Sequence, residues 1–215
     1  MRRRKIKGAL ERYKGYTEYA LPEGEGLSKA LNDFLAGPCQ WRGLEIGSGR
    51  GDFLVGMAKL NNQGKFLGIE MKEELLMRTA HKLESEGIHN VKLLLADASS
   101  CFDLFPKGVF NGIYLNFSDP WPKDRHAKRR LSHSRYLEAY RHMLAPEGQI
   151  VLKTDNRELF LYSLDSLREA EYDMIEVVED LTALADPMNV VTEYEAKFSA
   201  LGYPIYRVIA KPKSR

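Results

Sequence analysis

Residues 43–52 read GLEIGSGRGD, a pattern typical of a strand, a tight turn and the start of a helix. The first five residues form a short apolar run that stops at a glycine, as a buried strand does. Glycines at positions 47, 49 and 51 allow the backbone to turn sharply and to approach a ligand closely. A helical pattern over residues 52–60 follows directly.

The alternation of strand and helix patterns continues along the chain. Further strand patterns occur at residues 66–70, 91–96, 112–117, 149–154, 172–179 and 205–210, and helix patterns at residues 72–86, 132–144, 157–167 and 193–201. Strands of about five residues separated by helices of about 10–15 residues indicate βαβ units and a parallel sheet. The strands are apolar throughout, as in a sheet covered on both faces. The sequence therefore predicts an α/β fold.

Length and composition limit the class of protein. The chain has 215 residues, of which 44% are hydrophobic and 29% charged, as in an ordinary soluble domain with a buried core. It contains no run of about 18 apolar residues, and no apolar stretch of a secretory signal follows its N-terminus. Two cysteines, Cys39 and Cys101, provide neither a disulfide framework nor a zinc site. We therefore expect a cytoplasmic protein without a membrane span or a metal.

Basic residues are concentrated in two short segments. Residues 1–16 contain seven Lys or Arg residues against one Glu, and residues 123–135 contain six against one Asp. Because the whole chain has a net charge of only +2, the remainder is acidic. This distribution favours a polyanionic partner, and a solvated basic face is the alternative. We expect residues 1–20 to form a flexible basic arm and residues 21–215 to form a single domain.

The glycine-rich turn favours a ligand without phosphate groups. The dinucleotide-binding pattern G-x-G-x-x-G requires glycine at position 52, where this chain has Asp52. A carboxylate at the start of the next helix repels a pyrophosphate. Glu45 and Asp52 instead favour a positively charged ligand, and S-adenosylmethionine fits, since it carries an ammonium group, a sulfonium group and no phosphate. A turn with only a packing role is the alternative.

Acidic residues also follow the next two strands, at the edge where an open parallel sheet binds its ligands. Glu70 ends the second strand, at about the spacing from the turn at which an acid accepts the hydroxyl groups of a ribose. Asp97 follows the third strand, where it could accept the amino group of adenine. A surface position for Glu70 and a helix cap for Asp97 are the alternatives. The combination of Glu45, Glu70 and Asp97 is a stronger indication of a nucleoside site than any one of them.

A stiff aromatic loop and a basic run follow the fourth strand. Residues 116–123 read NFSDPWPK, in which two prolines restrict the backbone on either side of Trp121. The indole ring offers a flat face on which a base can stack. Residues 125–130 read RHAKRR, and arginines of this kind contact phosphates. The two features together favour a nucleic acid as the partner.

Two further polar segments have both a structural and a functional explanation. Asp155 follows the fifth strand, where it either caps the next helix or faces the ligand edge. Thr192 and Glu195 form a Thr-x-x-Glu capping box before a helical pattern, and their spacing alone favours capping.

The motifs EIGSGRG, GIE, LLADA, NFSDPWPKDRHAKRR, KTD and TEYEAKF occur in this order. Through them the chain resembles the bacterial tRNA (guanine-N7)-methyltransferase family over residues 15–212, most specifically over residues 116–130. The resemblance implies a Rossmann-like class I methyltransferase fold, with a seven-stranded, mostly parallel sheet whose last strand is antiparallel and with helices on both faces. It also implies S-adenosylmethionine as the cofactor and the guanine at position 46, in the variable loop of tRNA, as the substrate.

The resemblance also implies roles for individual residues. Asp119 is expected to be catalytic. The expected cofactor-binding residues are Glu45, Gly47, Gly49, Gly51, Glu70, Asp97 and Asp119. The expected substrate-binding residues are Lys123, Asp155, Thr192 and Glu195, and the expected RNA-binding residues are Arg125, His126, Lys128, Arg129 and Arg130. We expect tRNA as the partner of a monomer or homodimer.

The reaction chemistry agrees with these roles. Guanine N7 has an in-plane lone pair and no proton, so no general base is needed and catalysis rests on positioning and on carboxylates near the developing positive charge. A methyltransferase for a small-molecule or protein amine is the nearest alternative, because D-P-W-P is similar to the D/N-P-P-aromatic loop of N-methyltransferases. It leaves the basic segments without a role. A domain that only binds RNA is a second alternative, and it has no need of Glu70 and Asp97.

Overall fold

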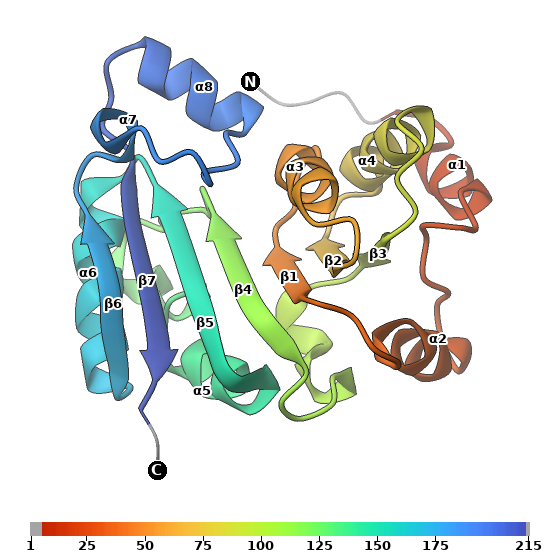
Figure 1. Ribbon diagram of the computed structural model, residues 1–215, viewed down its shortest axis with the longest axis horizontal. Coiled ribbons are helices and arrows are strands. Elements are labelled where there is room, and N and C mark those ends of the chain that lie inside the picture. Colours follow the sequence, from red (N-terminus) through yellow and green to blue (C-terminus); the bar gives the residue numbers. More distant parts are fainter. Residues whose placement is uncertain (1–5, 214–215) are drawn as a thin grey trace. The chain divides into compact units, whose positions relative to one another are not determined.

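The computed structural model describes residues 6–213 and contains seven strands in the order β3-β2-β1-β4-β5-β7-β6 (Figure 1). The strands are β1 (Arg42–Ile46), β2 (Lys65–Glu70), β3 (Val91–Leu95), β4 (Phe110–Asn116), β5 (Leu144–Thr154), β6 (Tyr172–Val178) and β7 (Tyr206–Pro212). Strand β7 is antiparallel to β5 and β6, whereas the pairs β1–β2, β2–β3 and β4–β5 are parallel. The expected α/β fold with an antiparallel last strand is confirmed.

Helices connect most of these strands. The α-helices are α1 (Ala9–Gly15), α2 (Gly26–Leu35), α3 (Asp52–Leu60), α4 (Glu73–Ser85), α5 (Ser134–Met143), α6 (Arg157–Glu169), α7 (Leu181–Leu184) and α8 (Glu193–Ala200). Short 3-10 helices are η1 (Ala98–Ser100), η2 (Phe102–Leu104) and η3 (Asp124–Arg129). Within residues 6–213, no helix combines the length and the apolar character that crossing a bilayer requires.

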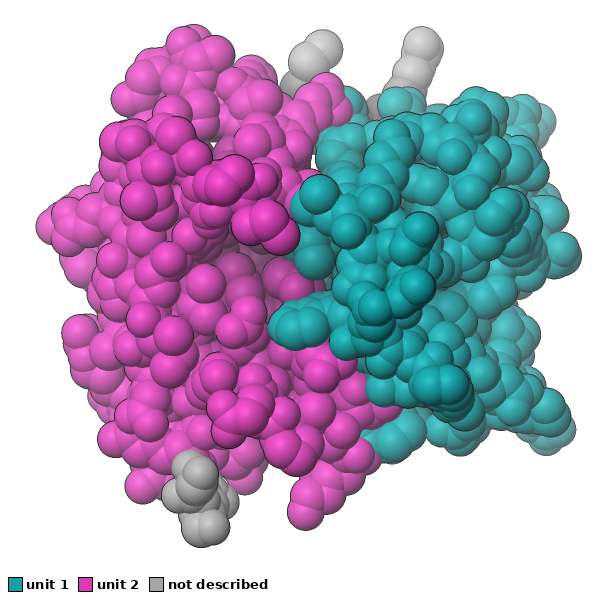
Figure 2. Space-filling model, viewed as in Figure 1, with its two compact units in different colours: residues 1–106 teal, residues 107–215 magenta. Residues whose placement is uncertain are grey.

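The chain divides into two compact units, residues 1–106 and residues 107–215 (Figure 2). Unit 1 contains β1 to β3 with α1 to α4, and unit 2 contains β4 to β7 with α5 to α8. The expectation of a single domain over residues 21–215 stays a prediction.

In unit 1 the register of the parallel strands aligns their carboxyl ends. Ile46 pairs with Ile69, and Glu70 pairs with Leu95. Leu44 of β1 and Leu67 of β2 are fully buried, so the strands are held by apolar packing as well as by their hydrogen bonds. The turn after β1 and the residues that follow β2 and β3 therefore start at one edge of this unit.

The segment over residues 9–20 belongs to the core of unit 1 and is not the arm that the charge distribution predicts. Helix α1 packs against α4 (Figure 1). The rings of Tyr13 and Tyr19 are 1% exposed, and the Tyr13 hydroxyl donates a hydrogen bond of 2.8 Å to the Leu93 carbonyl. The expectation of a flexible arm is wrong for these residues, because two buried aromatic rings fix the segment. Residues 1–5 lie outside the described part of the chain.

In unit 2 the strands β4 and β5 end side by side. Asn116 at the end of β4 pairs with Lys153 of β5, and Thr154 pairs with Tyr206 of the antiparallel β7. Ile113 and Leu152 lie in the buried interior of this unit. The loops that follow β4 and β5 therefore begin at the same edge of unit 2.

Candidate functional site

The glycine-rich turn between β1 and α3 has a left-handed backbone at each of its three glycines. The φ angles are 77° at Gly47, 55° at Gly49 and 75° at Gly51, a region that residues with a Cβ rarely adopt. A Cβ added at Gly47 would meet no atom within 4 Å, whereas one added at Gly51 would overlap the side chain of Thr79 in α4. The turn is therefore open at Gly47 and closely packed at Gly51.

Glu70 fastens this turn to the end of β2. Its Oε2 atom accepts a hydrogen bond of 3.1 Å from the Gly49 N–H, and its Oε1 atom accepts bonds from the N–H groups of Met71 and Lys72, at 2.9 and 3.1 Å. A carboxylate offers about four acceptor positions, so these three bonds leave one on Oε2 for a ligand hydroxyl. Glu70 thus orders the backbone around the turn, and its contact with a ribose stays a prediction.

The other two acids near the turn have different environments. Glu45, at the end of β1, is only 3% exposed. Asp52 forms an ion pair with Lys82 of α4. The charge of Asp52 is thus paired inside unit 1, and the expectation that it favours a positively charged ligand stays a prediction.

Asp97 caps the 3-10 helix that follows β3, as the structural alternative predicts. Its Oδ1 atom accepts hydrogen bonds from the N–H and the Oγ of Ser99, at 2.9 and 2.8 Å. The side chain is exposed. Its Oδ2 atom takes part in neither of these two bonds. Capping by one oxygen is compatible with ligand binding by the other, so the contact with adenine stays a prediction.

Taken together, these residues of unit 1 fit the nucleoside part of S-adenosylmethionine. A nucleoside needs acceptors for its ribose hydroxyl and amino groups. Glu70 keeps one acceptor position and Asp97 one oxygen, at the edge where the parallel strands end. The open space at Gly47 admits a ligand close to the backbone. Among residues 6–213, no group of three His, Cys, Asp or Glu side chains is arranged to hold a metal ion.

In unit 2 the turn that carries Asp119 is held between two residues with unusual backbone conformations. Phe117 has a φ angle of 51° and Trp121 one of 43°, values that are rare in residues other than glycine and that persist only where the surroundings enforce them. The Phe117 N–H donates a bond of 2.8 Å to the Lys153 carbonyl. The Asp119 side chain is exposed, so this strained turn presents a carboxylate to solvent.

Arg130 holds the same turn from the side of Trp121. Its Nε and Nη2 atoms donate hydrogen bonds to the carbonyls of Pro120 and Trp121, at 3.1 and 3.0 Å. Its guanidinium lies 4.2 Å from the ring centre of Tyr162. Arg130 therefore supports the loop, a role that the run of basic letters does not reveal, and its expected contact with RNA stays a prediction.

The remaining basic residues of this segment lie mostly at the surface. Arg125 and Lys128 of η3 are exposed, and neither has a carboxylate partner within the described residues. The Arg129 guanidinium lies 4.8 Å from the ring centre of Trp121, and the His126 ring meets that indole edge-on at 5.7 Å. A base that stacks on the covered face of Trp121 must therefore displace Arg129.

A buried ion pair closes the loop between α7 and α8 onto the end of β5. Lys153 and Glu195 are 2% and 3% exposed, and the lysine Nζ lies 2.6 Å from Glu195 Oε2. The same Nζ donates to Asn189 Oδ1 at 3.0 Å and to the Val190 carbonyl at 2.9 Å. Asn189 in turn donates to Glu195 Oε1 at 2.6 Å. All three donors of the ammonium group are thus used. The sequence patterns do not indicate that Lys153 and Asn189, which both precede Glu195 in the chain, are its partners.

Thr192 caps helix α8, because its Oγ1 accepts the Glu195 N–H at 3.1 Å. The capping explanation is confirmed for Thr192, whereas the Glu195 carboxylate accepts from Lys153 and Asn189 instead of completing a capping box. Thr192 is only 9% exposed, so both residues of the pattern lie inside unit 2. Their expected contact with a substrate stays a prediction.

Asp155 is linked to α8 and does not cap α6. The cap is Asn156, whose Oδ1 accepts the Leu159 N–H at 2.8 Å. The Tyr194 hydroxyl donates a bond of 3.3 Å to Asp155 Oδ2. Burial, followed by the charge of Asp155, raises the pKa of Tyr194 to about 12, so this hydroxyl stays protonated at neutral pH. The Tyr194 ring also packs on Phe117, with ring centres 4.8 Å apart.

A second ion cluster supports the loop from the side of β7. Arg207 donates to Glu176 at 2.7 Å and to Asp186 at 2.6 Å. The Met188 N–H and then the Arg207 guanidinium lower the pKa of Asp186. The loop that contains Asn189 is therefore fixed by charged groups at its start and at its end.

Replacing Lys153 by Met should lower the free energy of unfolding by about 3–5 kcal/mol, because Glu195 then stays buried without its cation. The double variant Lys153→Met, Glu195→Leu should recover most of this loss. Urea denaturation followed by circular dichroism measures both values. Lys211→Met is the matched control, since Lys211 forms an exposed ion pair with Glu147 that contributes about 1 kcal/mol or less. An equal loss of unfolding free energy in Lys153→Met and Lys211→Met would contradict the burial of the Lys153–Glu195 pair.

Comparison with known proteins identifies the family. Residues 40–208 match the family model described as "Putative methyltransferase". The tRNA (guanine-N(7)-)-methyltransferase of Oceanobacillus iheyensis is 46% identical over 164 residues, which are 76% of this chain and 77% of the relative. The protein of the same name from Streptococcus mutans serotype c is 42% identical and covers 98% of this chain and 100% of its own length.

A solved structure of an antibiotic-related methyltransferase has the same fold, with a TM-score of 0.69 and 15% identity over 89% of this chain and 97% of that one. The matches in sequence extend over nearly the whole chain and include both units. The chain therefore belongs to the tRNA (guanine-N(7)-)-methyltransferase family.

Proposed function

We propose that the protein uses S-adenosylmethionine to methylate N7 of a guanine in tRNA, namely the guanine at position 46 of the variable loop. The observation that carries the proposal is the turn over residues 117–121, in which two strained residues present the Asp119 carboxylate directly before the exposed basic helix η3. Family membership over nearly the whole chain supports the same reaction. The setting we propose is the cytoplasm, with the enzyme active as a monomer or a homodimer.

Residues of unit 1 hold the cofactor in this proposal. The remaining acceptor position of Glu70 binds a ribose hydroxyl, and Asp97 Oδ2 accepts the amino group of adenine. The turn at Gly47, Gly49 and Gly51 gives the ligand access to the backbone, and Glu45 lies at its base. When bound, S-adenosylmethionine supplies a methyl group, which forms a bond with the lone pair of guanine N7 while the electrons of the carbon–sulfur bond stay on sulfur.

The protein's contribution is to position the base and to stabilise charge. Because N7 carries no proton, no side chain has to act as a base. The purine gains a positive charge during the reaction, and a fixed carboxylate beside it stabilises that charge. Asp119 has this role, and it is exposed on the turn between Phe117 and Trp121.

Recognition of guanine requires an acceptor for its N1–H and N2–H groups, which adenine does not offer together. Asp155 supplies a carboxylate whose position is fixed by the Tyr194 hydroxyl. Lys123, exposed at the end of the turn, contacts a phosphate of the substrate. Thr192 and Glu195 hold the substrate site in place from inside unit 2, since one caps α8 and the other pairs with Lys153.

The reaction is tested with methyl-labelled S-adenosylmethionine and an unmodified tRNA transcript. We expect one methyl group per tRNA and chain cleavage at position 46 when the product is treated for 7-methylguanosine. A transcript with adenine at position 46 is the matched control and should gain no label. Label in a protein or a small amine without any RNA would contradict the proposed substrate.

Asp119→Asn keeps the size of the side chain and removes its charge. We expect kcat to fall by about 10²–10³-fold, the range for loss of one electrostatic contact in a transition state, while the Kd for tRNA changes less than about threefold. Asp124→Asn is the control, because Asp124 is an exposed acid of the same segment. A tRNA affinity that falls as much as kcat would show that Asp119 serves binding alone.

Arg130 and the exposed basic residues should differ in their effects. Arg130→Gln removes the two bonds to the turn, so we expect a lower kcat and a smaller change in the salt dependence of tRNA binding than the exposed basic residues give. Replacing both Arg125 and Lys128 by Gln should weaken binding. It should also make the slope of log K against log salt shallower by about 0.7–0.9 per lost phosphate contact. Filter binding at several salt concentrations measures the slope, and the reverse pattern would contradict these roles.

A further inference from the structure

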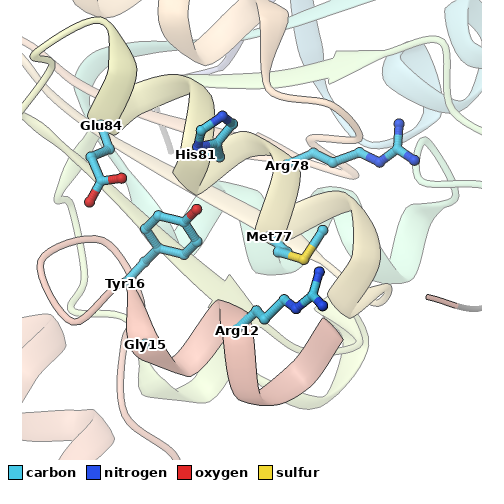
Figure 3. A pocket seen from close by; sticks show the side chains of 7 residues that line it. All are labelled: Arg12, Gly15, Tyr16, Met77, Arg78, His81 and Glu84. Atoms are coloured by element: carbon cyan, nitrogen blue, oxygen red, sulfur yellow. The ribbon is translucent and has the colours of Figure 1, made fainter. Parts of the chain in front are cut away.

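A groove of about 390 Å³ lies between α1 and α4 in unit 1 (Figure 3). Its lining includes Arg12 and Tyr16 from the N-terminal segment and Met77, Arg78, His81 and Glu84 from α4. None of these residues belongs to the glycine turn or to the acids assigned to the cofactor. The groove is of the size that proteins use for small organic groups, and the proposed function leaves it without a ligand.

The walls of the groove are fixed by the core beneath them. Tyr13 is buried in the same apolar cluster as Leu76 and Leu83 of α4. The backbone closes the end of α1, since the Tyr16 N–H donates to the Tyr13 carbonyl at 3.0 Å. Residues 77, 81 and 84 share one face of α4, because side chains three or four positions apart lie above one another on a helix. The exposed groups are therefore presented by two helices that cannot easily move apart.

The charges of the groove favour an anion at one end. Arg12 and Arg78 are exposed, and neither guanidinium has a carboxylate partner within residues 6–213. Figure 3 shows both arginines toward one end of the groove and Glu84 at the other. Two guanidinium groups without partners are suited to a phosphate, which they bind with charge-assisted hydrogen bonds.

The middle of the groove favours a flat ring. Tyr16 contributes its aromatic ring and His81 an imidazole, with the thioether of Met77 beside them. Unstacked RNA bases bind by stacking on such side chains. Glu84 lies six positions after Arg78, which corresponds to about 9 Å along the helix axis. A nucleotide bridges such a distance from its phosphate to the far edge of its base, where Glu84 accepts an N–H.

We propose that this groove binds a nucleotide of the tRNA substrate other than the guanine that is methylated. The phosphate lies between Arg12 and Arg78, and the base stacks on Tyr16. A polymer is favoured over a free nucleotide because the sequence before α1 contains Arg2, Arg3, Arg4 and Lys5, and a polyanion gains affinity from each phosphate that basic residues neutralise. The inference rests on the proposed function, because it takes tRNA as the partner.

The test is the double variant Arg12→Gln, Arg78→Gln, with tRNA binding measured by filter binding between about 0.05 and 0.3 M salt. We expect the Kd for tRNA to rise about tenfold or more, and the slope of log K against log salt to become shallower by about 0.7–0.9 per lost contact. We also expect the KM for tRNA to rise while the KM for S-adenosylmethionine stays the same. Circular dichroism confirms that the variant is folded.

The matched control is the double variant Lys29→Gln, Lys59→Gln. It removes an equal number of positive charges from exposed positions of unit 1, where the two lysines pair with Asp33 and Glu86. An equal loss of tRNA affinity in both variants would show a general effect of charge and overturn the proposal. A wild-type protein that binds tRNA without methylating it would overturn the proposed function, while the binding assay would still decide the role of the groove.

A third experiment distinguishes a nucleotide of tRNA from a free nucleotide as the ligand of the groove. Guanosine and adenosine monophosphate are titrated into the wild-type protein without tRNA, with calorimetry as the readout. We expect no binding below about millimolar concentration, because one phosphate and one base supply only a few contacts. Micromolar binding that the arginine variant abolishes, with unchanged tRNA affinity, would assign the groove to a free nucleotide and overturn the proposal.

Tyr16→Phe should keep tRNA affinity and Tyr16→Ala should lose it, as a stacking contact requires.

Discussion

Parallel pairing in a fixed register is the constraint on which the proposed cofactor residues of unit 1 and the proposed substrate residues of unit 2 each depend. In unit 1 it brings the turn after β1 and the ends of β2 and β3 to one edge, although these segments are about 25 residues apart in the chain. In unit 2 it places the end of β4 beside the end of β5, so that the Phe117 N–H meets the Lys153 carbonyl. A shift of one residue in the pairing of β2 would turn Glu70, its last residue, toward the opposite face.

Local patterns were sufficient for the fold and for the position of the functional loops. The glycine turn, the capping role of Thr192 and the stiff loop around Trp121 depend on residues within about six positions of one another, so single stretches of sequence contain the necessary information. The same locality leaves the cap of α6 undecided, since Asp155 and Asn156 are both good caps and their order in the chain does not say which one faces the helix.

Contacts between distant residues could not be predicted in this way. Tyr13 and the Leu93 carbonyl are 80 positions apart, and Lys153 and Glu195 are 42 apart. The basic composition around α1 predicts an arm, because counts of charged residues do not show that the tyrosines between them are buried. The basic run at residues 125–130 likewise does not reveal that the Arg130 guanidinium donates to two carbonyls of the neighbouring turn.

The buried ion pair is better explained by specificity than by stability. Two charges that leave water lose solvation that their attraction only partly restores, so an apolar pair of similar volume is often as stable. An apolar pair, however, packs in several ways. The Lys153 ammonium is satisfied only when Asn189, Val190 and Glu195 converge on it. Since Tyr194 precedes Glu195 directly and holds Asp155, the arrangement that satisfies the lysine also fixes the carboxylate proposed to read guanine.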